Sequence, residues 1–470
     1  MGAILIAAPK ISSPTTKRIL NLNYLKKFIH SDKTPMQILI LAAIVGTLVG
    51  FMGVLFQLGV DYLSQLRQSI PKQYFSETWQ VVVTTFAISF TLSLFAYYIV
   101  KKFSPESGGS GIPEIEGALQ DVRPVRWWRV LPVKFFGGLG TLSSGMVLGR
   151  EGPTVQLGAN LAAMVGAIFK VKLSENRHIL LASGAAAGLS VAFNAPFAGV
   201  IFVIEEMREE FKYGLISFKA VLIGAIMSTV VYRFINGNAS LLDVGIFGYA
   251  PMESLWLFIV MGFIIGVIGL LFNRSLLFLQ DCFQAFYNGK TYRFILMGGI
   301  IGGSCGVIAL YLPVVVGEGF NVIHDWTKGS FTLQMILIFF VIRFFTSIIS
   351  FSSGAPGGVF SPLLALGTLS GAFFGDIAAD LFPSYELHAG MFAIAGMGAL
   401  FAATVRAPLT GALLVLELTS NFALILPMLI TCLGATIVAQ LFGGRPLYTT
   451  LLKKTLAKEN KKLKLPLDQN

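Results

Sequence analysis

The sequence predicts an all-α polytopic membrane protein that is built from two homologous halves and contains broken, partly spanning helices. Three observations support this fold class. The composition is strongly apolar, because 55% of the 470 residues are hydrophobic and only 13% are charged, whereas a soluble domain has about 25% charged residues. Apolar runs of about 20 residues, the length that spans a bilayer, recur along the chain. Two stretches of the chain also resemble each other at a fixed spacing.

The predicted spanning helices are long apolar runs. The first, from Thr34 to Val60, contains no charged residue. The other uninterrupted candidates lie at residues 78–100, 216–232, 254–272, 293–316, 331–350 and 421–443. Five further apolar segments are too short, or too interrupted by Gly and Pro, to be ordinary spans. These broken segments are residues 109–119, 149–168, 184–205, 354–374 and 394–417.

Basic residues gather at the two ends of the chain. Residues 1–35 hold six Lys or Arg and one acid, and residues 445–470 hold seven Lys or Arg and two acids. Because Lys and Arg mark the cytoplasmic flanks of membrane helices, both termini are predicted to lie in the cytoplasm. The net charge of +11 therefore reflects membrane topology and gives no support to a nucleic-acid partner.

No residues have the spacing of a cofactor or metal site. The three cysteines, Cys282, Cys305 and Cys432, are far apart and lie in apolar surroundings. They are interpreted as packing residues and not as metal ligands or a disulfide framework. No dinucleotide-binding or phosphate-binding glycine motif is present. We therefore expect no cofactor, no metal and no enzymatic activity.

An internal repeat relates residues 184–206 to residues 396–418. Six residues recur at an offset of 212: Gly184, Ala195, Pro196, Gly199, Val203 and Glu205 match Gly396, Ala407, Pro408, Gly411, Val415 and Glu417. A looser match relates GREGPTVQLG to GGVFSPLLALG at an offset near 208. Paired halves with broken apolar segments in matching places are typical of a transporter's binding site.

The repeat divides the chain into four predicted regions. A cytoplasmic segment of residues 1–35 precedes a first membrane repeat at 36–235. The second membrane repeat occupies 252–445, and a cytoplasmic tail of residues 446–470 includes Tyr448.

A proline stands just inside the predicted start of each broken helix: Pro113, Pro153, Pro196, Pro362 and Pro408. Proline suits the first helical turn, because the N–H group that it lacks would have no intrahelical partner there. A helix that begins inside the membrane exposes free N–H groups and the positive end of its dipole. Such backbone is tolerated at that depth only where it lines a cavity or is buried in protein. These helix starts are therefore predicted to favour an anion.

Glu151 is the strongest candidate for a functional charge. It stands beside Arg150 in GREGP, between two apolar stretches. Pairing with Arg150, or capping the helix that starts near Pro153, would explain it structurally, but an ionisable group inside a membrane segment is functional by default. A carboxylate at a helix start occupies the place of an anion, and protonation removes its charge. Glu151 is therefore predicted to be a gate that links proton and anion occupancy.

Two neighbouring glutamates end the first repeated segment. Glu205 has Glu417 opposite it in the second half, which predicts a shared structural role. Glu206 has Leu418 opposite it, and this asymmetry favours a function for Glu206. The charge run VIEEMREE also fits the start of a hydrated loop, in which such charges need no special role.

The segment GSGIPEIE supplies a hydroxyl group and two acids. Ser110 could donate to an anion at the helix start, or it could be an ordinary N-cap. The pattern GGSG also fits the nucleophile of an intramembrane serine protease, which requires a histidine base. All four histidines lie in or beside polar connecting stretches, which disfavours the protease. Glu114 and Glu116 are interpreted as first-turn acids that stabilise the helix start.

Three motifs and a late tyrosine resemble a known family. GSGIPE (109–114), GREGP (149–153) and GGVFSP (357–362), with Tyr448, resemble the three-part selectivity filter of the CLC chloride channels and transporters. The resemblance covers about residues 30–455 and is specific, because the motifs occur together and in order. It implies inverted-topology halves and a homodimer with a separate pathway through each subunit. It also implies a multi-pass protein of the bacterial inner membrane, without the cytoplasmic regulatory domains of eukaryotic members.

The resemblance implies a set of chloride contacts. Ser110 and Tyr448 match side-chain ligands, and the backbone N–H groups of Val359 and Phe360 complete the central site. The filter then comprises Gly109, Ser110, Gly111, Ile112, Pro113, Gly149, Arg150, Glu151, Gly152, Pro153, Gly358, Val359, Phe360, Ser361 and Pro362. Ser110 favours chloride, because nitrate-preferring relatives carry proline at this position.

The resemblance also implies that two glutamates carry protons. Glu151 matches the external gating glutamate. Glu206 matches the internal proton-transfer glutamate, which the channel branch of the family generally replaces. The expected function is therefore electrogenic exchange of Cl− for H+ across the bilayer, with a role in extreme acid resistance that the family suggests. A passive chloride channel of the same fold is the alternative, and an intramembrane serine hydrolase is a distant one.

Overall fold

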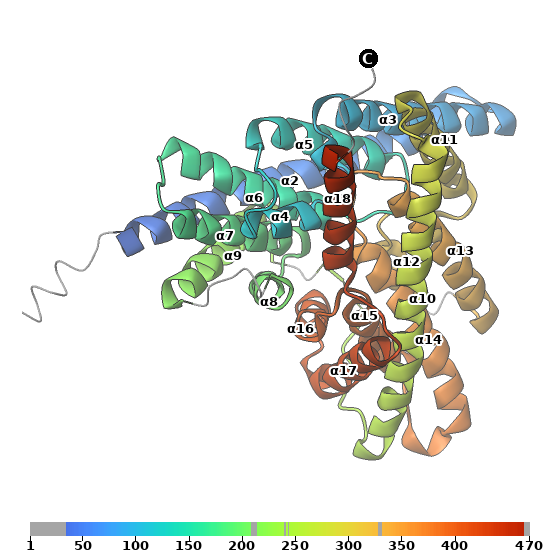
Figure 1. Cartoon of the computed structure of the whole chain (residues 1–470). Coiled ribbons are helices and arrows are strands. Elements are labelled where there is room, and N and C mark those ends of the chain that lie inside the picture. The colour runs from blue at the N-terminus through green and yellow to red at the C-terminus, as the bar shows by residue number, and fades with distance from the viewer. Residues whose placement is uncertain (1–33, 208–213, 239–240, 243, 328–330, 465–470) are drawn as a thin grey trace, which may run out of the picture. The chain divides into compact units, whose positions relative to one another are not determined.

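The computed structural model describes residues 34–207, 214–238, 241–242, 244–327 and 331–464 (Figure 1). The chain divides into two units, residues 1–37 and residues 38–470. The predicted cytoplasmic segment 1–35 lies almost wholly outside the described residues. The features that follow belong to the second unit.

Seventeen α-helices and five short 3-10 helices form the described part of the chain, which contains a single isolated β-bridge and no strand. Eight helices are long and apolar enough to cross a membrane. They are α2 (Thr34–Tyr74), α3 (Thr78–Phe103), α9 (Leu215–Asn236), α10 (Leu255–Tyr287), α11 (Thr291–Tyr311), α13 (Leu333–Ser352), α14 (Phe360–Leu381) and α17 (Ile425–Leu441). The other helices are α4 (Ile112–Leu119), α5 (Trp127–Ser143), α6 (Glu151–Ile168), α7 (Ser174–Phe193), α8 (Pro196–Glu206), α12 (Phe320–Thr327), α15 (Ala389–Val405), α16 (Pro408–Thr419) and α18 (Leu447–Lys464).

Seven of the eight long helices coincide with the seven predicted spans, and three of them end five or more residues away from the predicted end. The helix predicted at 254–272, α10, continues to Tyr287. The first continues past Val60 to Tyr74, so α2 has 41 residues. The run predicted at 293–316 ends at Tyr311, because Pro313 disfavours helical backbone before it and opens a 3-10 turn. The eighth, α14, falls in a segment predicted to be broken. Gly357 and Gly358 lie before its first turn, whereas Gly367, Gly371 and Gly375 lie within its 22 continuous residues, where they pack closely against α15.

The cysteines only partly follow the prediction. Cys305 and Cys432 are buried, as expected of packing residues, but Cys282 is exposed, so packing does not account for it. Within the described ranges, no group of three or more His, Cys, Asp or Glu side chains is placed to hold a metal ion.

The two repeated segments break at the same point. Asn194 is the C-cap of α7 and Arg406 is the C-cap of α15, and both residues have left-handed backbone, with φ of 54° and 77°. The next residues, Ala195 and Ala407, share φ near −125° (−128° and −121°) and ψ of 82° and 75°. A proline then starts the following helix in each half. The backbone of the break therefore recurs 212 residues later, in agreement with the sequence repeat.

Helix packing also recurs between the halves. α6 packs on α7, and α7 packs on α8 and α9. In the same way α14 packs on α15, and α15 packs on α16 and α17. Across the two halves α8 lies beside α16 (Figure 1). The predicted limits of the repeats, 36–235 and 252–445, stay a prediction.

The α8–α16 contact is made by the repeated glutamates. Each carboxylate accepts backbone hydrogen bonds from the start of the other helix: Phe197 and Ala198 donate to Glu417 at 3.2 and 2.7 Å, and Leu409 and Thr410 donate to Glu205 at 3.0 and 2.7 Å. The first N–H groups of a helix have no partner within it, and these carboxylates supply one. The shared structural role predicted for Glu205 and Glu417 is confirmed.

Candidate anion and proton site

Three loops meet at the starts of α4, α6 and α14. Gly149 and Gly358 exchange both of their backbone hydrogen bonds, with N···O distances of 2.8 and 2.7 Å. Gly109 donates to the Gly354 carbonyl at 3.4 Å, and Gly357 donates to the Gly109 carbonyl at 3.1 Å. The three predicted filter segments are therefore neighbours in space, although they are far apart in the sequence.

Each predicted proline lies in the first turn of its helix, where a missing N–H group costs nothing. Pro196 and Pro408 are the first residues of α8 and α16. Pro113 is the second residue of α4, and Pro153 and Pro362 are the third residues of α6 and α14. The expectation that these helices begin at the broken segments is confirmed.

Close packing of the loops depends on glycine at two positions. A Cβ atom at Gly149 would overlap the Glu151 carboxylate, and one at Gly152 would lie 2.5 Å from the Ser110 hydroxyl. Only glycine leaves room at such approaches. The second contact also places Ser110 directly against the first turn of α6.

The Glu151 carboxylate lies between two helix starts. Glu151 is the first residue of α6 and is wholly buried, with 0% of its surface exposed. It accepts a hydrogen bond from the hydroxyl of Ser361, in the first turn of α14. The backbone N–H groups of Glu151 and Ser361 also act on this carboxylate. Free N–H groups and two helix dipoles favour negative charge at this point, as the sequence predicts.

Arg150 pairs with Glu318 and not with Glu151. Its Nε atom lies 3.7 Å from Glu318 Oε2, and its guanidinium carbon lies 5.7 Å from the centre of the Phe320 ring. The structural alternative, in which Arg150 and Glu151 form an ion pair, is therefore wrong. Arg150 is only 5% exposed, so its charge needs this partner.

Glu318 is a site residue that the sequence analysis does not find. It is a single acid in the loop GEG, before α12, and belongs to none of the repeated motifs. Its side chain is 19% exposed. Burial raises the pKa of the Glu318 carboxyl above its ordinary value, Arg150 opposes this rise, and the nearby charge of Asp61 adds to it.

A buried arginine holds the Glu318 loop in place. Arg343 of α13 is 0% exposed. Its guanidinium donates to three carbonyl groups of the loop, those of Val314, Val316 and Gly317, at 3.1, 3.3 and 2.9 Å. The five donors of a guanidinium suit such a set of carbonyls, so Arg343 fixes the backbone from which Glu318 projects.

Two buried hydroxyl groups lie near each other next to the filter. Ser110 is 2% exposed, and Tyr448, the second residue of α18, is 0% exposed. The Tyr448 hydroxyl interacts with that of Ser110, and neither hydroxyl has another hydrogen-bond partner within the described part of the chain. Leaving a buried donor unpaired costs about 1–3 kcal/mol, and an anion that accepts from both groups would remove this cost.

The other interpretations of Ser110 do not hold. The N-cap of α4 is Gly111, and it has no side-chain cap. The Ser110 hydroxyl has no histidine or other base bonded to it among the residues described. The predicted N-cap role is therefore wrong, and the arrangement that a serine hydrolase requires is not found in this part of the chain.

The start of α14 offers backbone N–H donors in apolar surroundings. Val359 is the N-cap and Phe360 the first residue, so their N–H groups have no acceptor within the helix. The Phe360 ring is fully buried. Its centroid lies 4.6 to 6.3 Å from those of four other rings, Phe193, Phe202, Phe401 and Tyr448.

Glu206 lies within electrostatic range of Tyr448. It is the last residue of α8 and is half-buried, and the following residue, Met207, is fully buried. The charge of Glu206 acts on the Tyr448 hydroxyl, as does the charge of Glu151. The structure thus brings both candidate proton residues within electrostatic range of Tyr448, which the hydrated-loop alternative for Glu206 does not predict.

Two basic residues support the loop that carries Ser110. Lys134 of α5 is 0% exposed and donates to the carbonyls of Gly109 and Ser107 at 2.7 and 3.1 Å. A lone Lys in the apolar run VLPVKFFGGLG is the sequence signal that could have found it. Arg123 pairs with Glu114, with an Nε–Oε2 distance of 2.7 Å. Glu114 lies in the first turn of α4, as predicted, but Glu116 is the fifth residue of this helix, so the first-turn role predicted for Glu116 is wrong.

A cavity of about 270 Å³ reaches Ser110. Its walls include Gly109 and Pro113 from the filter, and Leu451 and Thr455 from α18. The α18 helix also packs against α4 (Figure 1). Of the two buried hydroxyl groups, this cavity reaches the one on Ser110.

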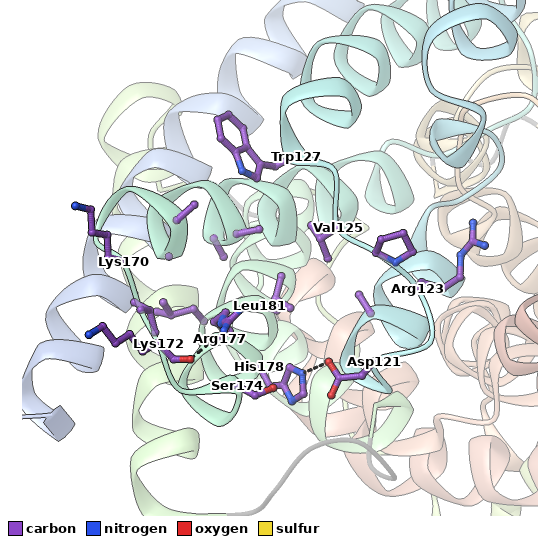
Figure 2. Close-up of a pocket in the computed structure, with 18 of the residues that line it drawn as sticks. Asp121, Arg123, Val125, Trp127, Lys170, Lys172, Ser174, Arg177, His178 and Leu181 are labelled. Atoms are coloured by element: carbon purple, nitrogen blue, oxygen red, sulfur yellow. Dashed lines mark hydrogen bonds and ion pairs between the residues drawn. The ribbon is translucent and has the colours of Figure 1, made fainter.

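A larger cavity, of about 830 Å³, lies apart from the filter. It is bounded by the loop between α4 and α5, the end of α6 and the start of α7 (Figure 2). Lys170, Lys172 and Arg177 stand at its rim, and His178 contacts Asp121 with an N···O distance of 3.1 Å. None of the predicted chloride or proton residues lines this cavity.

Comparison with known proteins identifies the family. Residues 92–440 match the family model described as "Voltage gated chloride channel". The chain is 53% identical to the H(+)/Cl(−) exchange transporter ClcA of Salmonella arizonae, over 96% of each protein. The chain belongs to the CLC family. The protein of the same name from Salmonella typhimurium is also 53% identical, over 96% of this chain and 97% of the relative.

Solved CLC structures have the same fold. A slow cyanobacterial Cl−/H+ antiporter superposes with a TM-score of 0.87 at 38% identity, over 90% of this chain and 99% of that one. A eukaryotic CLC transporter, 23% identical, superposes with a TM-score of 0.76 over 89% of this chain and 74% of that one. The CLC fold predicted from the three motifs and Tyr448 is confirmed.

Proposed function

We propose that this CLC protein is an electrogenic H+/Cl− antiporter, a multi-pass protein of the bacterial inner membrane that acts as a homodimer with one pathway in each subunit. Its relatives at 53% identity bear the name of H(+)/Cl(−) exchange transporter. The observation that carries the proposal is the position of the Glu151 carboxylate, which occupies an anion position between the starts of α6 and α14. A role in extreme acid resistance is part of the same proposal.

Chloride binds beside Glu151 in this scheme. The hydroxyl groups of Ser110 and Tyr448 donate from one side, and the N–H groups of Val359 and Phe360 donate from the start of α14. These donors are neutral, so they replace the water around the ion without holding it too tightly to leave. Glu151 competes with chloride for the adjoining position, because both are anions at the same helix starts.

Protonation of Glu151 switches the site. The neutral carboxyl group is no longer attracted by the helix starts, so it leaves and chloride takes its place. Glu206, whose charge acts on the Tyr448 hydroxyl, passes protons between Glu151 and the cytoplasm. Chloride and protons move in opposite directions, so each cycle carries net charge in one direction.

The sides of the membrane follow from the predicted cytoplasmic termini. α18 starts beside the filter at Tyr448 and leads into the C-terminal tail, so the cavity that reaches Ser110 opens toward the cytoplasm. Arg150 and Glu318 then lie on the outer side of Glu151.

Uphill transport distinguishes an antiporter from a passive channel. Liposomes that contain the purified protein are loaded with chloride at equal concentration on both sides, and a proton gradient is imposed. Antiport predicts that chloride accumulates on one side, and that a proton ionophore abolishes this accumulation. A passive chloride channel moves no chloride uphill, and that result would exclude the proposal.

A further inference from the structure

The larger cavity joins a basic turn to an apolar floor. Its volume of about 830 Å³ lies within the range of about 300–1,000 Å³ that is typical of small-molecule sites. The proposed antiport mechanism uses none of the residues that line it. We propose that this cavity binds the headgroup of an anionic phospholipid from the cytoplasmic leaflet. This inference does not depend on antiport, but it uses the predicted cytoplasmic position of the chain termini.

The cavity lies at the predicted cytoplasmic end of the surrounding helices. Arg123, in its wall, also pairs with Glu459 of α18, the helix that leads into the C-terminal tail. Ala162 and Leu180, on its floor, belong to one apolar cluster with Ile38, which is near the start of α2. Because both termini are predicted to be cytoplasmic, the cavity is on the cytoplasmic side.

Positive charge dominates the walls of the cavity. Four cations line it: Arg123, Lys170, Lys172 and Arg177. Among the described residues that line it, Asp121 is the single acid. Lys170 and Lys172 stand at one edge, at the turn between α6 and α7, whereas Asp121 contacts His178 away from that turn (Figure 2). Basic pockets at the cytoplasmic ends of membrane helices suit anionic lipid headgroups.

Exposed apolar side chains flank the basic turn. Ile168, Phe169 and Leu173 are 61%, 56% and 60% exposed, and they alternate in sequence with Lys170 and Lys172. This alternation suits the membrane interface, where apolar side chains enter the acyl region and lysines reach the headgroups. A tryptophan pair at the start of α5 also lines the cavity, and tryptophan is enriched at this depth. The occupant is therefore a lipid and not a soluble phosphate compound.

The backbone at Lys170 is unusual for a lysine. Val171 donates to the Gly166 carbonyl at 2.9 Å, and Lys170 donates to the Ala167 carbonyl at 3.2 Å. This is the Schellman pattern of a helix end, and it places Lys170, with φ of 51°, at the position that glycine usually takes. Left-handed backbone is costly for a residue with a Cβ atom. Backbone stability alone does not select lysine there, whereas a ligand that needs its ammonium group does.

Arg177 and the start of α7 add donors at the same edge. The Arg177 Nη2 atom donates to the Lys172 carbonyl at 2.9 Å, which holds the guanidinium beside the turn. Its other N–H groups suit the oxygens of a phosphate. α7 begins at Ser174 without a side-chain cap, and the first N–H groups of a helix have no partner within it. Side-chain cations and backbone donors thus converge on one edge of the cavity.

The test compares two lipids that share a phosphate and differ in net charge. Purified protein in detergent is titrated with phosphatidylglycerol, which is anionic, and separately with phosphatidylcholine, which has no net charge. The midpoint of thermal unfolding and the lipid retained in native mass spectrometry are measured. Phosphatidylglycerol should be retained and should raise the midpoint at concentrations at which phosphatidylcholine has no effect.

The double variant Lys170→Gly/Lys172→Gln removes the basic edge. Each lost charge should weaken phosphatidylglycerol binding about fivefold. Because glycine suits the left-handed backbone at position 170, the variant without lipid should unfold at no lower temperature than the wild type. A purely structural role for Lys170 predicts the opposite. Lys172→Gln alone changes an exposed side chain and should bind about fivefold more weakly.

A matched control removes two cations from another turn on the same side. Lys290 and Arg293 lie at the turn between α10 and α11 and do not line the cavity. The end of α10 is on the predicted cytoplasmic side, because Asp281 pairs with Lys454 of α18 at 2.7 Å. Lys290→Gln/Arg293→Gln should bind phosphatidylglycerol as the wild type does.

Three results would overturn the proposal. Equal binding of the two lipids would show that charge does not select the occupant. An equal loss in the two double variants would show that the lipid responds only to total charge on this side. An equal rise in the unfolding midpoint with glycerol 3-phosphate, at the concentration used for the lipid, would assign the cavity to a soluble phosphate compound. None of these results bears on antiport, which ion fluxes test separately.

Discussion

The two halves of this protein place different residues on the same scaffold. α6 begins with Arg150 and Glu151, and α14 begins 209 residues later with Val359 and Phe360. The loops before these helices pair symmetrically, yet one start presents a carboxylate and the other presents an apolar ring. In the proposed mechanism, the two paired helix starts attract the anion. The carboxylate on only one of them is the part that responds to protons.

The same contrast recurs at the other broken segments. Glu205 and Glu417 make equivalent hydrogen bonds across the α8–α16 contact. The next residue is Glu206 in the first half and Leu418 in the second. The proposed proton residues therefore lie in the first half, at the two places where the repeat loses its symmetry. Changes at asymmetric positions should alter coupling, and changes at symmetric positions should alter stability.

The largest effect is expected from Glu151→Ala. Without the carboxylate, no proton-dependent group competes with chloride, so proton transport should vanish and chloride flux should become independent of pH. The matched control is Phe360→Leu at the equivalent start of α14, which should leave proton transport measurable. Chloride and proton fluxes in liposomes check both variants. A chloride current that still depends on pH in Glu151→Ala would speak against the gate.

A smaller change is expected from Glu206→Gln. The amide cannot carry a proton, so proton flux should be lost while chloride still moves through the unaltered filter. Glu205→Gln, one residue away, is the control and should keep coupled transport. Retained proton coupling in Glu206→Gln would rule out the internal proton role.

The smallest functional effect is expected from the symmetric pair. Glu205→Gln and Glu417→Gln each weaken charge-assisted hydrogen bonds to two N–H groups, which should lower the free energy of unfolding by about 1–3 kcal/mol in either half. Thermal unfolding of the purified protein in detergent measures this loss, and the ratio of chloride to protons should not change. An altered ratio in one variant alone would show that the two glutamates are not equivalent.

The sequence predicts the parts of the site that local backbone chemistry determines. Proline and glycine mark the helix starts, and the offset of 212 residues identifies Glu205 and Glu417 as partners in a symmetric contact. The sequence cannot predict the partner of Arg150, because Glu318 is 168 residues away, in a loop that belongs to none of the repeated motifs. The role of Lys134 is equally hidden, since its acceptors are backbone carbonyls that any residue could provide.

The helix limits that the sequence misplaces have a similar cause. α2 continues to Tyr74, and α14 is one continuous helix. Both results depend on tertiary packing, which overrides the local pattern of apolar residues.

The reversal potential of the purified protein tests coupled exchange most directly. The current is measured across a bilayer with a fixed chloride gradient and an opposed proton gradient. Antiport predicts that the reversal potential differs from the chloride equilibrium potential, and that it moves when the proton gradient alone is changed. A reversal potential that stays at the chloride equilibrium value whatever the proton gradient would contradict exchange and establish a passive chloride pathway.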